Sequence, residues 1–187
     1  KDRNIFIKYD ITLSYKLKLF TDMQIRKYSH NSNGSDNDRS VINFDSKNIF
    51  FNPKIGFNLK LNPKSNIYSS VSVANREPIR IDFLDSYEKP KHETLYDFEF
   101  GYNINYNLGF FKTNLYWMEY KNQLITTGEL NDVGGYIRTN AKKSRRVGIE
   151  IVNRIITKKF NISSSLTLSK NFVYDFNEIL YDYGNDF

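Results

Sequence analysis

The chain has 187 residues, of which 40 % are hydrophobic, 26 % are charged and 16 % are aromatic, and its formal net charge at pH 7 is +6. This balance excludes a chain that is disordered throughout and favours one domain or part of a larger one. The absence of cysteine excludes a disulfide framework and a thiolate metal site. Lysine and arginine are spread along the chain rather than gathered in one stripe, which argues against a nucleic-acid-binding surface.

The first half of the chain contains four stretches in which apolar or aromatic residues alternate with polar ones. They cover residues 4–16, 19–28, 51–61 and 67–76. Successive side chains leave opposite faces of a β-strand, so each stretch predicts a strand with one apolar and one polar face. In the third stretch, Phe57 belongs to the apolar face and Lys54 to the polar face.

The clearest alternation is "LYDFEFGYNINY", residues 95–106. Its even positions from Tyr96 to Tyr106 are all aromatic or aliphatic. Ten residues at ~3.3 Å each, tilted by roughly 40°, rise about 25 Å, which is near the apolar height of an outer-membrane barrel. Packing of the same aromatic residues in the core of a soluble β-sandwich is the alternative.

Three more alternating stretches complete a set of eight predicted strands. They cover residues 111–120, 145–151 and 162–171. No segment keeps a helical period, and no run approaches the ~18 consecutive apolar residues of a transmembrane helix.

The predicted connections alternate between short and long. Short turns are expected near residues 16–18, 62–66, 107–109 and 157–159, and long polar connections at 29–48, 77–94 and 126–137. Regular alternation places all tight turns at one end of an up-and-down sheet and all long loops at the other. The predicted fold class is therefore all-β, an antiparallel up-and-down transmembrane β-barrel segment of about eight strands.

In such a barrel the apolar face of each strand meets lipid and the polar face lines the lumen. The residues predicted to face lipid are Phe57, Tyr96, Phe98, Phe100, Tyr106, Ile149 and Leu166. The residues predicted to face the lumen are Lys54, Asp97, Glu99, Arg146, Glu150 and Ser165. Their charges are expected to form a cross-strand lattice rather than a catalytic carboxylate pair, and we expect no enzymatic activity and no cofactor.

Candidate ligand contacts lie where strands pass into the long connections, because binding residues concentrate on loops held by a rigid scaffold. The candidates are Asn75, Arg76, Glu77, Arg80, Asn131, Asp132, Tyr136 and Arg138. The alternative is that "NREP" only ends a strand, with Arg76 paired to a neighbouring carboxylate. The two histidines, His30 and His92, are expected to be solvated loop residues rather than metal ligands.

Four segments together resemble the barrel of TonB-dependent outer-membrane receptors, particularly those of Bacteroidetes-type bacteria. They are "FFNPKIGFNLKLNPKSNIYSSVSVANREPIRIDF", "LYDFEFGY", "NLYWMEYKNQLITTGELNDVGGYIRTN" and "SRRVGIEIVNR". The likeness covers about residues 49–172 and is weaker in 3–28. It implies a twenty-two-stranded barrel with an N-terminal plug, driven by TonB and importing a metal–siderophore, haem, a vitamin or a glycan.

The resemblance implies as partners the outer-membrane lipid, the TonB complex through an N-terminal part, the ligand and a surface lipoprotein. Residues 1–187 show neither the plug, the TonB box nor the other strands, so we expect a partial barrel domain that belongs to the C-terminal part of the barrel, without its end. Its first and last strands, 3–15 and 160–174, should not pair with each other. The alternatives are a passive porin or adhesin, and a soluble β-barrel binding module.

Overall fold

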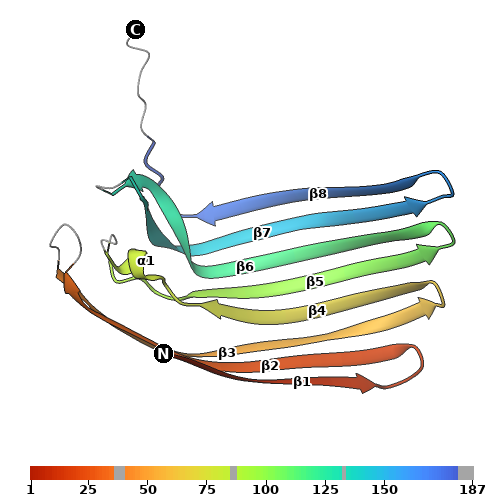
Figure 1. Ribbon diagram of the computed structural model, residues 1–187, viewed down its shortest axis with the longest axis horizontal. Coiled ribbons are helices and arrows are strands. Elements are labelled where there is room, and N and C mark those ends of the chain that lie inside the picture. Colours follow the sequence, from red (N-terminus) through yellow and green to blue (C-terminus); the bar gives the residue numbers. More distant parts are fainter. Residues whose placement is uncertain (36–40, 85–87, 132–133, 181–187) are drawn as a thin grey trace, which may run out of the picture.

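The computed structural model describes residues 1–35, 41–84, 88–131 and 134–180, which form one open antiparallel sheet (Figure 1). Every strand lies beside its neighbours in sequence, in the order β1 to β8. The strands are β1 (Asp2–Thr12), β2 (Leu17–Ser35), β3 (Val41–Asn62), β4 (Ser65–Arg76), β5 (Glu93–Tyr106), β6 (Gly109–Leu130), β7 (Tyr136–Ile156) and β8 (Asn161–Tyr174). In these residues β1 pairs only with β2, and β8 only with β7. The expected up-and-down sheet with unpaired end strands is confirmed.

One short helix, α1 (Arg80–Leu84), interrupts the connection between β4 and β5. It escaped the sequence prediction because five residues are too few to show a period of 3.6. Across the described ranges, no helix has the length and apolar character needed to span a membrane.

Two hairpins extend further than the alternation predicts. The β2–β3 pairing continues to Ser35 and Val41, and the β6–β7 pairing continues to Leu130 and Tyr136. Both hairpins project past the ends of β4, β5 and β8 (Figure 1). The expected long loops at 29–48 and 126–137 are therefore mostly strand. Their backbone hydrogen bonds form without an apolar face, so the sequence shows no alternation there.

Pro53 marks the point where the first hairpin leaves the sheet. The β3–β4 ladder ends at the pair Lys54 and Ser72. Pro53, which precedes Lys54 in β3, has no N–H to donate. Beyond it, the Asn52 side-chain oxygen accepts a hydrogen bond from the Asn75 backbone N–H at 3.0 Å. This side chain replaces the ladder and lets β3 separate from β4.

The register gives the sheet two chemically distinct faces, because residues directly opposite each other share a face. Phe57, Ser69, Phe100, Leu115, Ile149 and Leu168 follow one another across six strands. The first of these faces, here called the apolar face, carries Phe57, Tyr96, Phe98, Phe100, Tyr106, Ile149 and Leu166. The opposite one, here called the polar face, carries Lys54, Asp97, Glu99, Arg146, Glu150 and Ser165.

On the polar face, three glycines are covered by an aromatic ring from the neighbouring strand. In each case a β-carbon added to the glycine would collide with the ring. Such an arrangement packs a flat ring on the backbone and fixes strand register. The three pairs are Phe20 with Gly56, Tyr68 with Gly101 and Tyr116 with Gly148.

Buried apolar side chains gather at the end of the sheet that carries the long connections. Phe50 is 3 % exposed, and Leu124, Ala141 and Pro78 are also buried there. Midway along the strands, by contrast, the apolar face leaves large side chains open, with Phe98 46 % exposed. The chain's own core thus supports the connections rather than the middle of the sheet.

Candidate functional site

Helix α1 links the two projecting hairpins at the end of the sheet where the ligand contacts were predicted (Figure 1). On one side, the Phe83 ring stacks on Phe44 of β3 with centroids 4.3 Å apart. On the other side, the Asp82 carboxylate pairs with the Arg138 guanidinium of β7 at 2.6 Å. One helical turn therefore contacts both hairpins at once.

The Asp82 carboxylate is the buried centre of this link, with its side chain 1 % exposed. One oxygen accepts a hydrogen bond from the Ile79 backbone N–H at 2.8 Å, which fixes the start of the helix. The other oxygen accepts from Arg138 Nε at 2.8 Å. A buried carboxylate needs such a partner, so Arg138 supports α1 in this structure.

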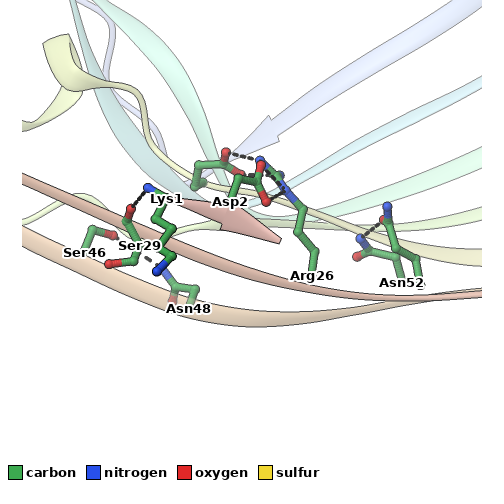
Figure 2. Close-up of polar contacts among 9 residues, drawn as sticks. Lys1, Asp2, Arg26, Ser29, Ser46, Asn48 and Asn52 are labelled. Atoms are coloured by element: carbon green, nitrogen blue, oxygen red, sulfur yellow. Dashed lines mark hydrogen bonds and ion pairs between the residues drawn. The ribbon is translucent and has the colours of Figure 1, made fainter. Parts of the chain in front are cut away.

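Arg26 of β2 lies beside Asp2 of β1 (Figure 2) and, through Glu77, holds the connection after β4 against the polar face. Its Nη2 contacts Asp2 of β1 at 2.6 Å, and its Nη1 and Nη2 contact both carboxylate oxygens of Glu77 at 2.7 Å. Bidentate contacts of this kind are the strong form of the charged hydrogen bond. Glu77 is thus anchored within the chain.

Asn75 and Arg76 are also engaged by neighbouring residues. The Asn75 amide accepts from the Thr94 hydroxyl at 2.8 Å, in addition to its contacts with Asn52. Arg76 pairs with Glu93 at 2.8 Å, and the Glu93 carboxylate also accepts from the Leu124 backbone N–H. Arg76 thus pairs with a neighbouring carboxylate, and its contact with a ligand stays a prediction.

The β6–β7 hairpin carries the other predicted contacts. Asn131 closes its tip, because its side-chain oxygen accepts from the Gly135 backbone N–H at 2.6 Å. Tyr136 is 65 % exposed at the start of β7. Arg80 lies on α1 with its side chain exposed. Asp132 lies outside the described residues.

A recess of about 570 Å³ opens between the β2–β3 hairpin and the connection that leads into β5. Its polar lining includes Asp45, Lys47, Asn48, Lys89, Lys91 and His92. Three of these residues are lysines with exposed side chains. The sequence interpretation missed them because nothing in the residue pattern shows that residues 45–48 and 89–92 meet.

The histidines differ from the expected solvated loop residues. His30 lies within β2 against the Phe44 ring at 5.1 Å, and His92 lies against the buried Phe50 ring at 5.3 Å. Each is half-buried in an aromatic contact. The described part of the chain contains no group of three or more histidine and acidic side chains arranged to hold a metal.

The charged residues of the polar face form local cross-strand contacts. Lys54 lies 3.7 Å from Glu99, and the Arg146 guanidinium lies over the Tyr120 ring at 5.1 Å. One carboxylate oxygen of Asp97 is buried without a hydrogen-bond partner among the described residues. Such an atom needs a water molecule or another group against this face.

Comparison with known proteins identifies the architecture. The family model "TonB dependent receptor-like, beta-barrel" matches residues 1–187. Among solved structures, the copper transporter OprC is similar with a TM-score of 0.79 and 13 % identity, over 92 % of this chain and 28 % of that one. The FrpB iron transporter from Neisseria meningitidis (F3-3 variant) has a TM-score of 0.69 and 18 % identity, over 94 % and 26 %. A search of curated protein sequences finds no match.

The siderophore receptor PirA from Pseudomonas aeruginosa is a further structural relative, with a TM-score of 0.69 and 14 % identity, over 92 % of this chain and 34 % of that one. Identities this low show a shared fold. The chain spans between 26 % and 34 % of the length of these three structures. The family match covers every residue, and members of that family are outer-membrane proteins of Gram-negative bacteria. This chain belongs to the TonB-dependent receptor-like β-barrel family.

Proposed function

We propose that the chain is part of the wall of an outer-membrane receptor that uses TonB to import a scarce nutrient, and that it is not an enzyme. The observation that carries this proposal is the pair of unlike faces of the open sheet. Side chains such as Phe98 and Trp117 stay nearly half exposed on the apolar face. A face of this kind fits the hydrocarbon region of a membrane, while the opposite face fits a lumen.

In this arrangement the apolar face meets outer-membrane lipid and the polar face meets the lumen. The uncompensated Asp97 oxygen supports this orientation, since a lumen supplies water or a plug surface to a polar atom. The larger protein would contain a twenty-two-stranded barrel with an N-terminal plug, to which residues 1–187 contribute a partial barrel domain. The N-terminal part would contact TonB.

The ligand is proposed to reach the protein at the α1 end of the sheet. The recess with Lys47, Lys89 and Lys91 favours an anionic ligand, because the basic side chains exceed the single carboxylate of Asp45. A metal–siderophore fits this preference, and haem, a vitamin or a glycan are the other classes. The similar structures include a copper transporter, an iron transporter and a siderophore receptor, which supports the first class.

The roles of the predicted contact residues divide into two groups. Tyr136 and Arg80 are proposed to meet ligand from the rim of the connections, and Asp132 stays a prediction of the same kind. The remaining candidates are proposed to shape the connections through the contacts described above. They are Asn75, Arg76, Glu77, Asn131 and Arg138. A surface lipoprotein is a further proposed partner, in keeping with the resemblance to Bacteroidetes-type receptors.

Growth of the source bacterium on limiting nutrient tests the transport proposal. Uptake by the full-length protein should disappear when TonB is deleted, while the amount of receptor in the outer membrane stays constant. Uptake that persists without TonB contradicts energised transport.

Two double variants test whether the ligand binds at the recess. Lys89→Glu with Lys91→Glu should weaken uptake, because both residues line the recess. Lys158→Glu with Lys159→Glu makes the same charge change in the short turn at the opposite end of the sheet. Equal uptake by both double variants would place the ligand elsewhere.

A further inference from the structure

The apolar face carries a cluster of basic side chains at the α1 end of the sheet. The cluster, here called the cationic rim, consists of Lys121 of β6, Lys143 and Arg145 of β7 and Lys170 of β8. The register places all four on the face of Phe98 and Ile149, since Lys121 lies opposite Lys143 and Lys170 opposite Val147. Below it the apolar face of β4 to β8 carries no charged residue in the strands described.

The cationic rim has more positive charge than its neighbours neutralise. Glu119, opposite Arg145, is the carboxylate of this cluster, and it pairs with Arg145 and with Lys143 at 3.7 Å. Lys121 and Lys143 face each other directly, an arrangement that costs energy until an anion lies between them. Four cations against one carboxylate call for a ligand with more than one negative charge.

Aromatic rings hold the basic side chains against the sheet. The Arg145 guanidinium lies 4.5 Å from the Trp117 ring centroid, Lys143 lies over Tyr174 at 5.5 Å, and Lys170 lies over Phe172 at 5.0 Å. Amphipathic aromatic side chains of this kind concentrate at the level of lipid headgroups. The rim therefore has the composition of a headgroup contact.

An apolar groove of about 310 Å³ lies directly beside the rim on the same face. It ends at Glu119, where the rim begins, and its floor is almost free of polar surface. Its apolar lining includes Pro53, Ile55, Val71, Tyr96, Phe98 and Trp117, and Ser72, Asp97 and Glu119 are its polar residues. A groove of this chemistry suits an acyl chain.

We propose that the cationic rim and the groove together bind a phosphorylated glycolipid of the outer leaflet. Arg145 and the lysines contact its phosphate groups, and the groove receives one of its acyl chains. The charge excess favours a lipid with several phosphate charges over a phospholipid with one. This inference rests on the outer-membrane location proposed above and does not depend on TonB-driven transport.

Native mass spectrometry of the detergent-purified full-length receptor tests the proposal, with diphosphorylated lipid A, its dephosphorylated form and phosphatidylglycerol as probes. The test variant is Lys121→Gln, Lys143→Gln and Lys170→Gln. The control variant is Lys18→Gln, Lys60→Gln and Lys112→Gln, which removes the same charge from the polar face. Heat-modifiable migration on gels verifies that both variants fold.

Wild-type and control receptors should retain lipid A, and the test variant should bind it about a hundredfold more weakly, the loss expected for three basic side chains near an anionic lipid. Inorganic phosphate alone should not displace the lipid, because it cannot fill the groove. Equal retention by the two variants overturns the site. Equal retention of dephosphorylated lipid A or phosphatidylglycerol overturns the choice of ligand. Normal uptake by the Lys89→Glu and Lys91→Glu double variant would count against the ligand recess and leave the lipid site standing.

Discussion

The hydroxyl of Tyr68 on β4 donates a hydrogen bond to Oδ1 of Asn114 on β6 at 3.0 Å, across the whole width of β5. Gly101 is the residue of β5 that lies opposite both of them. Because it has no side chain, the tyrosine ring passes over the backbone and reaches the second strand. Three strands are tied together on the polar face by one ring.

Gly101→Val should destabilise the barrel. The added side chain collides with the Tyr68 ring and displaces its hydrogen bond, at a cost of about 1–3 kcal/mol. The apparent urea unfolding midpoint of the full-length receptor in detergent measures this loss. Asn103→Val places the same side chain two residues along the same face of β5 and should change the midpoint little. Equal midpoints for the two variants would contradict the packing described for Tyr68.

Phe98→Arg should reduce the amount of receptor assembled in the outer membrane. An arginine on the lipid-facing side near the membrane midplane costs roughly 2–4 kcal/mol, whereas a lumen position tolerates it. Glu99→Arg is the matched change on the next residue, and it removes the contacts of Glu99 with Lys54 and with the Ser70 hydroxyl. Outer-membrane fractions analysed by immunoblot give the comparison. Equal amounts of the two variants would overturn the assignment of the faces.

Arg26→Gln should loosen the connection between β4 and β5. It leaves Glu77, whose side chain is 16 % exposed, without its guanidinium partner, a loss of about 1–2 kcal/mol. Limited trypsin digestion should then cleave after Lys91 about tenfold faster. Lys8→Gln breaks the exposed pair with Asp22, which joins β1 and β2 as the Arg26–Asp2 pair does, and serves as control. Cleavage at one rate in both variants would show that Arg26 does not anchor the connection.

Arg138 separates the structural from the ligand-binding interpretation of the connections. Arg138→Ala removes the partner of a buried carboxylate, which costs about 3–5 kcal/mol. Asp82→Asn breaks the same pair from the other side. If the pair only supports α1, both variants should lose stability and uptake in parallel. A normal uptake rate for Asp82→Asn together with none for Arg138→Ala would instead assign Arg138 to the ligand.

The alternation of side chains predicted the two faces because the period of a strand is two and each face keeps its own chemistry. Phe57, Phe98 and Ile149 therefore lie together, and Lys54 and Glu99 lie together opposite them. The same rule fails in the projecting hairpins, where segments such as "YSHNSNGS" have no apolar face and still form strand. Their pairing depends on the backbone, which the residue pattern does not report.

The ion pairs that hold the connection between β4 and β5 could not be predicted from the sequence, for a different reason. Arg26 and Glu77 are separated by 51 positions, and Asp82 and Arg138 by 56. Which charges meet over such distances depends on strand register and on the path of a connection, neither of which is local. Arg76 and Glu77 have partners within the chain, and the prediction that they contact a ligand stays a prediction.

The placement of α1 has a mechanical consequence. The helix contacts two hairpins that leave the sheet at different points. Phe83 contacts the β2–β3 hairpin, and Asp82 contacts the β6–β7 hairpin. A molecule that displaces either hairpin must also strain the contact between α1 and the other hairpin. The β2–β3 and β6–β7 hairpins are therefore expected to move together, so that displacement of one hairpin also displaces the other.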